Sequence, residues 1–321
     1  MSFKSDLYRA PDSSLWKGRV DSETDQSQFR YHQVVETTDL RSSIPSNEKV
    51  LLGFPCDIGV KRNGGRTGAA EGPDYFSSSI GSLSWHGDDD FCDTGNITPK
   101  NNNLESAQQE LGKTIHLLLK KGNIPTVIGG GHETAFGHFL GIAGFLQETE
   151  PDCKIGILNI DAHFDLRPYN GVAHSGSPFL QAHEHAKEND LDLKYFVYGI
   201  NRDNNTSSLF KTAEDLDVRY CENIQVMNSE SECLKNVSRF IHSRTHIYLT
   251  ICLDVFKASV APGVSAPAWN GIDLIHGLNI IELVKQSGKL ISADICELNP
   301  SFDEHKKTAK LAGSLFSKLI G

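Results

Sequence analysis

Short apolar runs and longer amphipathic segments alternate along most of the chain. The apolar runs lie at 49–54, 124–130, 154–160, 194–200, 217–221, 246–255 and 289–295. Segments with helical spacing lie between most of them, at 104–121, 134–149, 206–216, 230–243, 271–287 and 303–320. This alternation predicts an α/β fold with a parallel sheet. Because the runs are apolar almost throughout, we expect helices to cover both faces of the sheet.

The first 48 residues lack this alternation. They are polar and only weakly periodic, so we expect residues 1–48 to form an N-terminal extension that packs on the core. No linker composition divides the remainder, and residues 49–321 are predicted to be a single domain. Within it, the glycine-rich stretches 59–72 and 167–178 follow predicted strand ends and are typical of functional loops.

Acids, histidines and one cysteine stand where four of the predicted strands end. In chain order they are His132; then Asp161, His163 and Asp165; then Cys252 and Asp254; then Asp294 and Glu297. Ligands of open α/β sheets bind beyond the carboxyl ends of the strands. We therefore expect these side chains to meet at one edge of the sheet.

The strongest single pattern is D-x-H-x-D, formed by Asp161, His163 and Asp165. Alternate residues of an extended segment share a face, so the three side chains can reach one metal ion or a pair of ions. Carboxylates with imidazole suit a fairly hard divalent ion such as Mn²⁺, and two such ions can activate a water molecule. A capping cluster at a helix start is the alternative, but it leaves the other three strand ends unexplained.

The stretch 129–134, "GGGHET", also resembles part of a dinucleotide-binding fingerprint. It follows a predicted strand and precedes a predicted helix, and Asp161 could serve as the ribose-binding acid. However, Thr134 stands where the third glycine is needed, and a nucleotide site would leave both histidines and Asp165 without a role. We therefore favour the metal site.

Four motifs follow one another along the chain: "GGGH" (129–132), "DAHFD" (161–165), "TICLD" (250–254) and "DICELNP" (294–300). By these motifs the chain resembles the arginase/agmatinase (ureohydrolase) family from about residue 48 to the end. Three further segments resemble the formimidoylglutamase branch of that family: "WKGRVD" (16–21), "SGSPF" (175–179) and "VAPGVSAP" (260–267).

The resemblance implies a three-layer α/β/α fold with an eight-stranded parallel sheet and a site for two Mn²⁺ ions. Matched position by position, His132 and Asp165 would bind one ion. His163 and Asp254 would bind the other, and Asp161 would bridge both.

Cys252 is the departure from the family pattern, because it falls where the family has a second bridging aspartate. A thiolate is soft and Mn²⁺ prefers oxygen, so we expect a weakened second ion, a one-metal site or a softer metal. A free cysteine in a buried strand is also often only a small hydrophobic residue.

The activity that the resemblance implies is metal-dependent hydrolysis of N-formimidoyl-L-glutamate to L-glutamate and formamide, a step of histidine degradation. Asp165 and His174 are the expected proton carriers, and Glu297 is expected to hold the cationic amidine. The candidates for binding the substrate's carboxylates lie in Gly- or Asn-rich segments, and they are Arg62, Arg66, Arg202 and Asn205.

Two alternatives stay open. One is another ureohydrolase activity, on arginine, agmatine or guanidinobutyrate. The other is a metal-poor, non-catalytic protein of the same fold that lost its metal pair through Cys252.

The composition limits which kinds of partner and which cellular compartment we expect. A net charge of −10 argues against nucleic acid and anionic membranes as partners. No apolar run is long enough to span a membrane, and the first residues lack the apolar core of a signal peptide. The seven cysteines are scattered, which is typical of reduced thiols. We expect a cytoplasmic enzyme with a small-molecule substrate and leave open a homo-oligomer.

Overall fold

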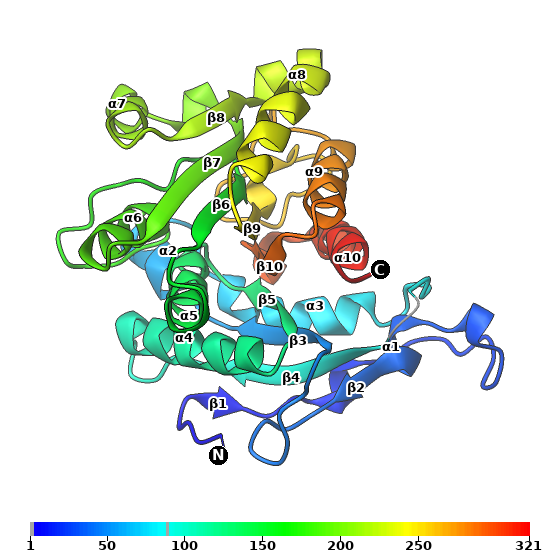
Figure 1. Ribbon diagram of the computed structural model, residues 1–321. Coiled ribbons are helices and arrows are strands. Elements are labelled where there is room, and N and C mark those ends of the chain that lie inside the picture. Colours follow the sequence, from blue (N-terminus) through cyan, green and yellow to red (C-terminus); the bar gives the residue numbers. More distant parts are fainter. Residues whose placement is uncertain (1–2, 88–89) are drawn as a thin grey trace.

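One sheet runs through the molecule, a computed structural model that describes residues 3–87 and 90–321 (Figure 1). Its strands are β1 (Tyr8–Arg9), β2 (Val35–Thr37), β3 (Lys49–Phe54), β4 (Phe91–Ile97), β5 (Ile124–Gly129), β6 (Lys154–Ile160), β7 (Asp192–Ile200), β8 (Arg219–Glu222), β9 (His246–Cys252) and β10 (Leu290–Cys296). Their order is β1-β4-β3-β5-β10-β9-β6-β7-β8, and β2 also pairs with β4. From β4 to β8 all the pairings are parallel.

Helices cover both faces of this sheet, which confirms the predicted three-layer class. One face carries α4 (Leu104–Lys120), α5 (Thr134–Thr149), α6 (Pro178–Glu188) and α7 (Ser207–Asp215). The other carries α3 (Gly72–Ile80), α8 (Asn223–His242), α9 (Leu274–Gln286) and α10 (Lys307–Ile320). Two short helices, α1 (Tyr31–Val34) and α2 (Ile58–Arg62), lie in the connections.

Successive strand residues alternate between two hydrophobic cores. In β3, Val50 and Leu52 pack on the α4–α5 side, whereas Leu51 packs on the α3–α10 side. This alternation follows from the two-residue repeat of a strand. It requires apolar residues at nearly every position, which is the pattern seen in the sequence.

Helices α4 and α5 approach each other closely because glycines face each other at their crossing. A Cβ built on Gly141 would lie 2.5 Å from the carbonyl oxygen of Gly112. A larger side chain there would separate the helices, so the crossing depends on these glycines. The close packing fixes α5, which begins two residues after His132, against the sheet.

The sheet has ten strands instead of the expected eight, because two short strands precede residue 49. The eight strands β3 to β10 are the parallel set that was expected, and β1 and β2 add to the outer edge of β4. Strand β4, "FCDTGNI", was missed because Asp, Gly and Asn disfavour strands. It is nevertheless buried along its whole length.

The described part of the predicted extension, residues 3–48, lies against β4; residues 1–2 fall outside the described chain. Tyr8 pairs with Ile97, and the indole nitrogen of Trp16 donates a 2.8 Å hydrogen bond to the buried carboxylate of Asp93. Tyr31 packs edge-on against Trp85, with ring centroids 5.1 Å apart. These residues therefore complete a core that β4 alone would leave exposed.

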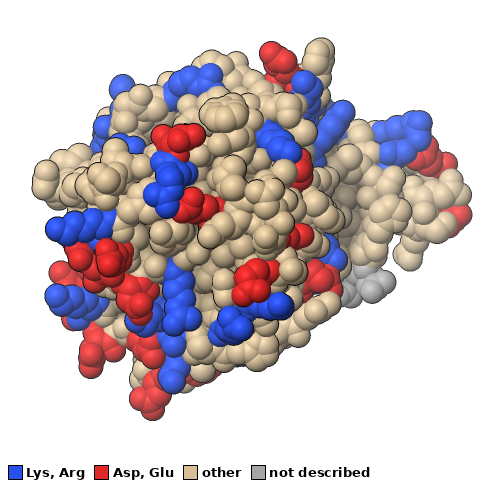
Figure 2. Space-filling model, turned by 90° about the horizontal axis from the view of Figure 1, so that it is seen from above, with Lys and Arg blue, Asp and Glu red and all other residues tan. Residues whose placement is uncertain are grey.

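Acidic and basic side chains are interspersed on the face seen from above (Figure 2). No large area of that face carries a single sign of charge. Among the described helices, none has the length and apolar character needed to cross a membrane.

Candidate metal centre

The four strand ends that carry acids and histidines are neighbours in the sheet. The central order β5-β10-β9-β6 places the segments after these strands side by side at the carboxyl edge. His132 follows β5, and Asp161 follows β6. Asp254 lies in a single helical turn, Leu253–Val255, directly after β9, and Glu297 follows β10. The four segments, more than 160 residues apart at the extremes, therefore meet at one locus.

His132 faces two carboxylates. Its Nδ1 lies 3.0 Å from Oδ2 of Asp161 and 3.0 Å from Oδ2 of Asp165. His132 is 1% exposed and Asp161 is 0% exposed, so bulk water cannot screen these groups. This trio forms one half of the candidate centre.

His163 forms the other half with Asp254 and the second oxygen of Asp161. Its Nδ1 lies 3.2 Å from Oδ2 of Asp254 and 3.4 Å from Oδ1 of Asp161. The two oxygens of Asp161 therefore face opposite halves, Oδ2 toward His132 and Oδ1 toward His163. This is the arrangement that a carboxylate needs in order to bridge two cations.

Cys252 lies within reach of the first half. Its Sγ, a nitrogen of His132 and an oxygen of Asp161 are all within 4.8 Å of one another. A second set with the same spacing consists of Asp161, His163 and Asp254. Asp161 belongs to both sets. Cys252 belongs to the set with His132 and Asp161, so its sulfur would reach the first ion and not the second.

Two buried atoms of the centre lack hydrogen-bond partners among the described residues: Nδ1 of His132 and Oδ1 of Asp254. The Asp161 and Asp165 oxygens are near enough to Nδ1, but they do not lie along the direction of a ring N–H. Buried polar atoms without partners are costly. Imidazole and carboxylate donors that converge in this way fit divalent cations, because a cation would satisfy all of them together.

The pKa values of the buried acids also favour a bound cation. Burial favours a higher pKa for Asp161, but the adjacent His132 and His163 imidazoles outweigh burial and hold this pKa well below its ordinary value. Burial and the charge of Asp161 raise the pKa of Asp165 to about 6. Burial and the charge of Asp254 raise the pKa of Glu297 to about 7. So many buried carboxyl groups ionise together readily only beside a positive charge.

Two residues of the centre have a backbone conformation that is unusual outside glycine. The φ angle is 48° at Asp165 and 74° at Glu297. Both are held by neighbours: the carbonyl of Asp165 accepts from Phe179 N, and Glu297 N donates to the carbonyl of Gly130 at 2.7 Å. Strain of this kind is found at functional sites, where the surroundings fix the conformation.

A cavity of about 180 Å³ opens onto the centre. Its lining residues are Asn63, Gly64, Gly65, His132, His163, Asp165, Arg167, Ser175, Cys252, Asp254, Ser265, Ala266 and Glu297. Glu297 is held in the wall because its two oxygens accept from the backbone nitrogens of His132 at 3.1 Å and Ser265 at 3.3 Å. The cavity thus joins the acid and histidine cluster to a carboxylate of fixed orientation.

The arginines expected to bind substrate are not among the residues that line this cavity. Arg62 pairs with Glu105 at 2.5 Å, and Arg66 donates to the carbonyl of Val264 while it lies over the ring of Phe302. Arg202 pairs with Glu222. Each guanidinium is therefore engaged in the protein itself.

Asn205 and His174 also lie outside the lining. The Asn205 amide bonds the backbone of Ala162, Phe164 and Asn201, so it supports the loop that carries His163. Nδ1 of His174 accepts from Gly176 N at 3.2 Å, and burial lowers the pKa of this half-buried ring. The neighbouring Ser175 lines the cavity instead.

Arg167 is the basic residue on the cavity that the sequence reasoning missed. It continues the alternation of Asp161, His163 and Asp165 by one more step, which was a usable signal. Within residues 3–87 and 90–321, no carboxylate oxygen pairs with its guanidinium. Arg167 therefore offers the cavity a cation that no described carboxylate neutralises.

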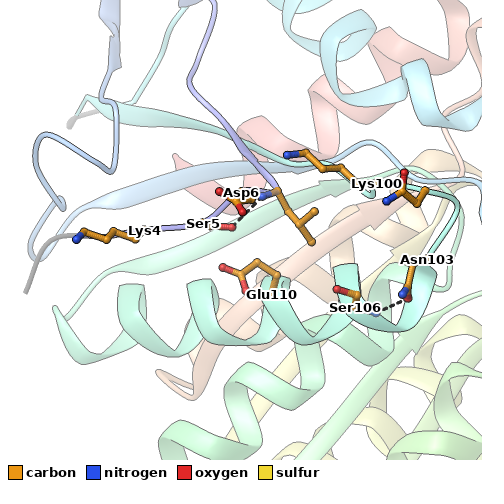
Figure 3. Close-up of a pocket in the computed structure, with 9 residues that line it drawn as sticks. Lys4, Ser5, Asp6, Lys100, Asn103, Ser106 and Glu110 are labelled. Carbon is orange, nitrogen blue, oxygen red and sulfur yellow. Dashed lines mark hydrogen bonds between the residues drawn. The ribbon is translucent and has the colours of Figure 1, made fainter.

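A larger hollow, of about 640 Å³, lies between the N-terminal segment and the start of α4 (Figure 3). Its labelled side chains include Lys4, Lys100 and Glu110, together with Asn103, which caps α4 by accepting from Ser106 N. The lining contains neither histidine nor cysteine and shares no residue with the metal centre. It therefore offers no comparable set of ligands.

Comparison with known proteins identifies the family to which this fold and its candidate metal centre belong. The model of the arginase family matches residues 47–321. The chain belongs to the arginase family. Formimidoylglutamase of Lysinibacillus sphaericus is 40% identical over 311 residues, which cover 95% of this chain and 94% of that protein. Formimidoylglutamase of Rhodococcus jostii is 42% identical over 306 residues, which cover 95% and 94%.

Solved structures of the arginase family share the fold. The crystal structure of Trypanosoma cruzi formiminoglutamase with Mn²⁺ has a TM-score of 0.76 and 24% identity, and the match covers 91% of this chain and 97% of that one. Formimidoylglutamase from Bacillus subtilis has a TM-score of 0.78 and 17% identity, with coverage of 95% and 94%. At such identities the likeness establishes the fold alone.

Proposed function

We propose that this arginase-family chain hydrolyses N-formimidoyl-L-glutamate to L-glutamate and formamide with two Mn²⁺ ions. The observation that carries the proposal is the composition of the cavity. A carboxylate and imidazole cluster forms one part of its lining. The guanidinium of Arg167, which pairs with no carboxylate in the described part of the chain, forms another. Relatives named formimidoylglutamase that match along nearly the whole chain support the same substrate.

The shared position of Asp161 supports the assignment of metal ligands. His132 and Asp165 would hold one ion, His163 and Asp254 the other, and Asp161 both, since its two oxygens face the two halves. Cys252 would contribute sulfur to the first ion. When bound, such ions supply a nucleophile at neutral pH and polarise the group that is attacked.

The chain's own residues orient the substrate and handle protons. Glu297, which is fixed by two backbone amides, accepts hydrogen bonds from the amidinium and so presents the formimidoyl carbon. Arg167 pairs with a carboxylate of the glutamate part. Water adds to the formimidoyl carbon, the bond from that carbon to the glutamate nitrogen breaks, and this nitrogen takes up a proton. Asp165, which lines the cavity beside the centre, is placed to carry that proton.

The direct test is a comparison of substrates for protein loaded with Mn²⁺. We expect formamide to be released from N-formimidoyl-L-glutamate, with essentially no urea from L-arginine or agmatine. Neither of these substrates can place two carboxylates near Arg167, and agmatine carries none. Efficient release of urea from either would refute the substrate assignment. The absence of any product, with Mn²⁺ bound, would favour a non-catalytic role.

Changing Cys252→Asp is expected to raise the affinity for Mn²⁺ by about tenfold, because a carboxylate oxygen suits this ion better than sulfur does. Titration of the protein with Mn²⁺, followed by the electron paramagnetic resonance signal of the free ion, measures the change. Cys252→Ser is the matched control, since it removes the sulfur without adding a carboxylate. Equal affinities for Cys252→Asp and the native protein would argue that this position makes no bond to the metal.

We also propose that the protein works in the cytoplasm on a small molecule. The seven described cysteines are all free, which supports a reducing compartment. An assembly of several copies is compatible with the proposal and is decided by the mass of the protein in solution.

A further inference from the structure

A chain of buried polar side chains runs from the metal centre into the layer between the sheet and α5. Its centre is Asp294, on β10, which is 0% exposed. Oδ1 of Asp294 accepts a 2.5 Å hydrogen bond from Oγ1 of Thr250. Oδ2 accepts from the hydroxyl of Tyr248 and lies 2.8 Å from Nδ1 of His138. Asp294 is itself outside the cavity, so it does not touch the substrate.

The hydrogen bonds of Ser292, at the end of the row farthest from the metal centre, determine which nitrogens of His138 carry protons. The hydroxyl of Ser292 has one proton, and it donates that proton to the carbonyl of Pro125 at 2.6 Å. Ser292 must therefore accept from Nε2 of His138, which lies 2.6 Å away. Nδ1 of His138 faces a carboxylate oxygen that only accepts, so this nitrogen also donates. Both ring nitrogens of His138 therefore face acceptors, and Nδ1 donates to Asp294.

Asp294 is held as a carboxylate by these donors. Burial favours a higher pKa for this carboxyl group, but the hydrogen bond and charge of His138, with the help of Thr250, hold the pKa below its ordinary value. A carboxylate cannot donate, so the proton between Asp294 and Thr250 must be the one on the Thr250 hydroxyl.

The hydroxyl of Thr250 connects Asp294 to His132 of the metal centre. Since Thr250 gives its only proton to Asp294, its oxygen must accept from Nε2 of His132, which lies 3.0 Å away. With its proton on Nε2, a neutral His132 has a lone pair on Nδ1. This is the nitrogen that lies 3.0 Å from Asp161 and from Asp165 and has no hydrogen bond among the described residues.

We propose that Thr250, Asp294 and His138 are positioning residues that fix the ring and tautomer of His132, and so set the affinity for the cation that His132 binds. The inference rests on the proposed function, because it needs a cation at the centre. Partners that orient a metal-bound histidine commonly change metal affinity by about 10- to 100-fold when they are removed.

A separate metal site is the other explanation for this cluster. Donor atoms of His132, Asp294 and Cys296 lie within 4.8 Å of one another. However, the hydroxyl of Thr250 bridges His132 and Asp294. Both oxygens of Asp294 already accept hydrogen bonds, Oδ1 from Thr250 and Oδ2 from Tyr248 and His138. A cation would have to displace these bonds, so the positioning role fits the contacts better.

The test compares Thr250→Val with Thr250→Ser. Valine has nearly the shape of threonine but no hydroxyl, whereas serine keeps the hydroxyl. We expect Thr250→Val to raise the dissociation constant of the Mn²⁺ ion that His132 binds by about 10- to 100-fold, and Thr250→Ser to change it by less than about threefold. Titration followed by the resonance of free Mn²⁺ gives both values without any use of substrate.

Two further measurements separate positioning from damage to the fold. Raising Mn²⁺ should restore kcat of Thr250→Val to near the native value, because Thr250 does not line the cavity. Asp294→Asn, which keeps the shape of the side chain but removes its charge, should weaken Mn²⁺ binding in the same direction. It serves as the second variant if Thr250→Val does not fold.

The outcomes are distinguishable. Native affinity in a folded Thr250→Val protein, or equal weakening by valine and serine, would overturn the positioning role and leave the proposed function intact. Failure of the native protein to bind Mn²⁺ at all would overturn both. Weak Mn²⁺ binding in Thr250→Val, with native Mn²⁺ binding in Thr250→Ser and kcat restored by excess metal, would support the positioning role of these side chains.

Discussion

Asp161→Asn is expected to reduce the release of formamide by about 10³-fold or more. Among the described residues, Asp161 is the carboxylate whose two oxygens face opposite halves of the centre, so an amide in its place would weaken both ions at once. A metal pair supplies several kcal/mol to the transition state, and about 4 kcal/mol corresponds to a thousandfold in rate. The rate is measured at a Mn²⁺ concentration that saturates the native protein.

The fold should survive this change. Oδ1 of Asp161 accepts a 2.7 Å hydrogen bond from His163 N, and an amide oxygen can accept the same bond. The amide nitrogen would replace Oδ2, so the change removes one hydrogen bond, the one that Asn159 donates. Asp152→Asn is the matched control, because Asp152 is an exposed acid that precedes the opposite end of β6. It should leave turnover unchanged. An Asp161→Asn protein that keeps more than about a tenth of the native rate, with a native melting curve in EDTA, would contradict the bridging role.

Arg167→Ala is expected to raise KM for N-formimidoyl-L-glutamate by about 10- to 100-fold, with a much smaller change in kcat. A hydrogen bond between charged groups contributes about 1.5–3 kcal/mol, and Arg167 can make two to one carboxylate. The carboxylate is not altered in the reaction, so its contact stabilises the substrate and the transition state alike. Arg167→Lys should recover only part of the loss, because lysine lacks the planar fork.

Arg202→Ala is the matched control for Arg167. Arg202 is exposed, paired with Glu222 and outside the cavity lining, so its removal should leave KM within about twofold. A simple N-alkylformamidine, which has no carboxylate, should be hydrolysed equally by the native and Arg167→Ala proteins. If Arg202→Ala raised KM and Arg167→Ala did not, the substrate would have to lie differently from the pose proposed above.

Local patterns in the sequence were sufficient to predict the layers and most elements of the fold. The helix expected at 134–149 has those bounds, and the strand expected at 154–160 has them too. These elements have strong periodicity, or continuous apolar residues, that need no knowledge of distant contacts. Strand β4 shows the limit, since Asp93, Gly95 and Asn96 form a strand only because neighbours such as Trp16 and Leu51 satisfy and cover them.

For the centre, the sequence determined which residues stand at strand ends, and tertiary structure decided how they meet. The D-x-H-x-D spacing predicted a shared face for Asp161, His163 and Asp165. Only the strand order β5-β10-β9-β6 brings His132 and Asp254 beside them. That order is set by packing between segments far apart in the chain, which no local pattern encodes.

The substrate side of the cavity was the least predictable part. Arg62, Arg66 and Arg202 lie in connecting segments that the sequence rightly placed after strands, but their partners lie 20 to almost 200 residues away. Those partners turn each guanidinium toward the protein, whereas no carboxylate of residues 3–87 or 90–321 pairs with Arg167. An arginine's residue type and loop position are written in the sequence. Whether its charge is available to a ligand depends on the carboxylates and carbonyls that the fold brings to it.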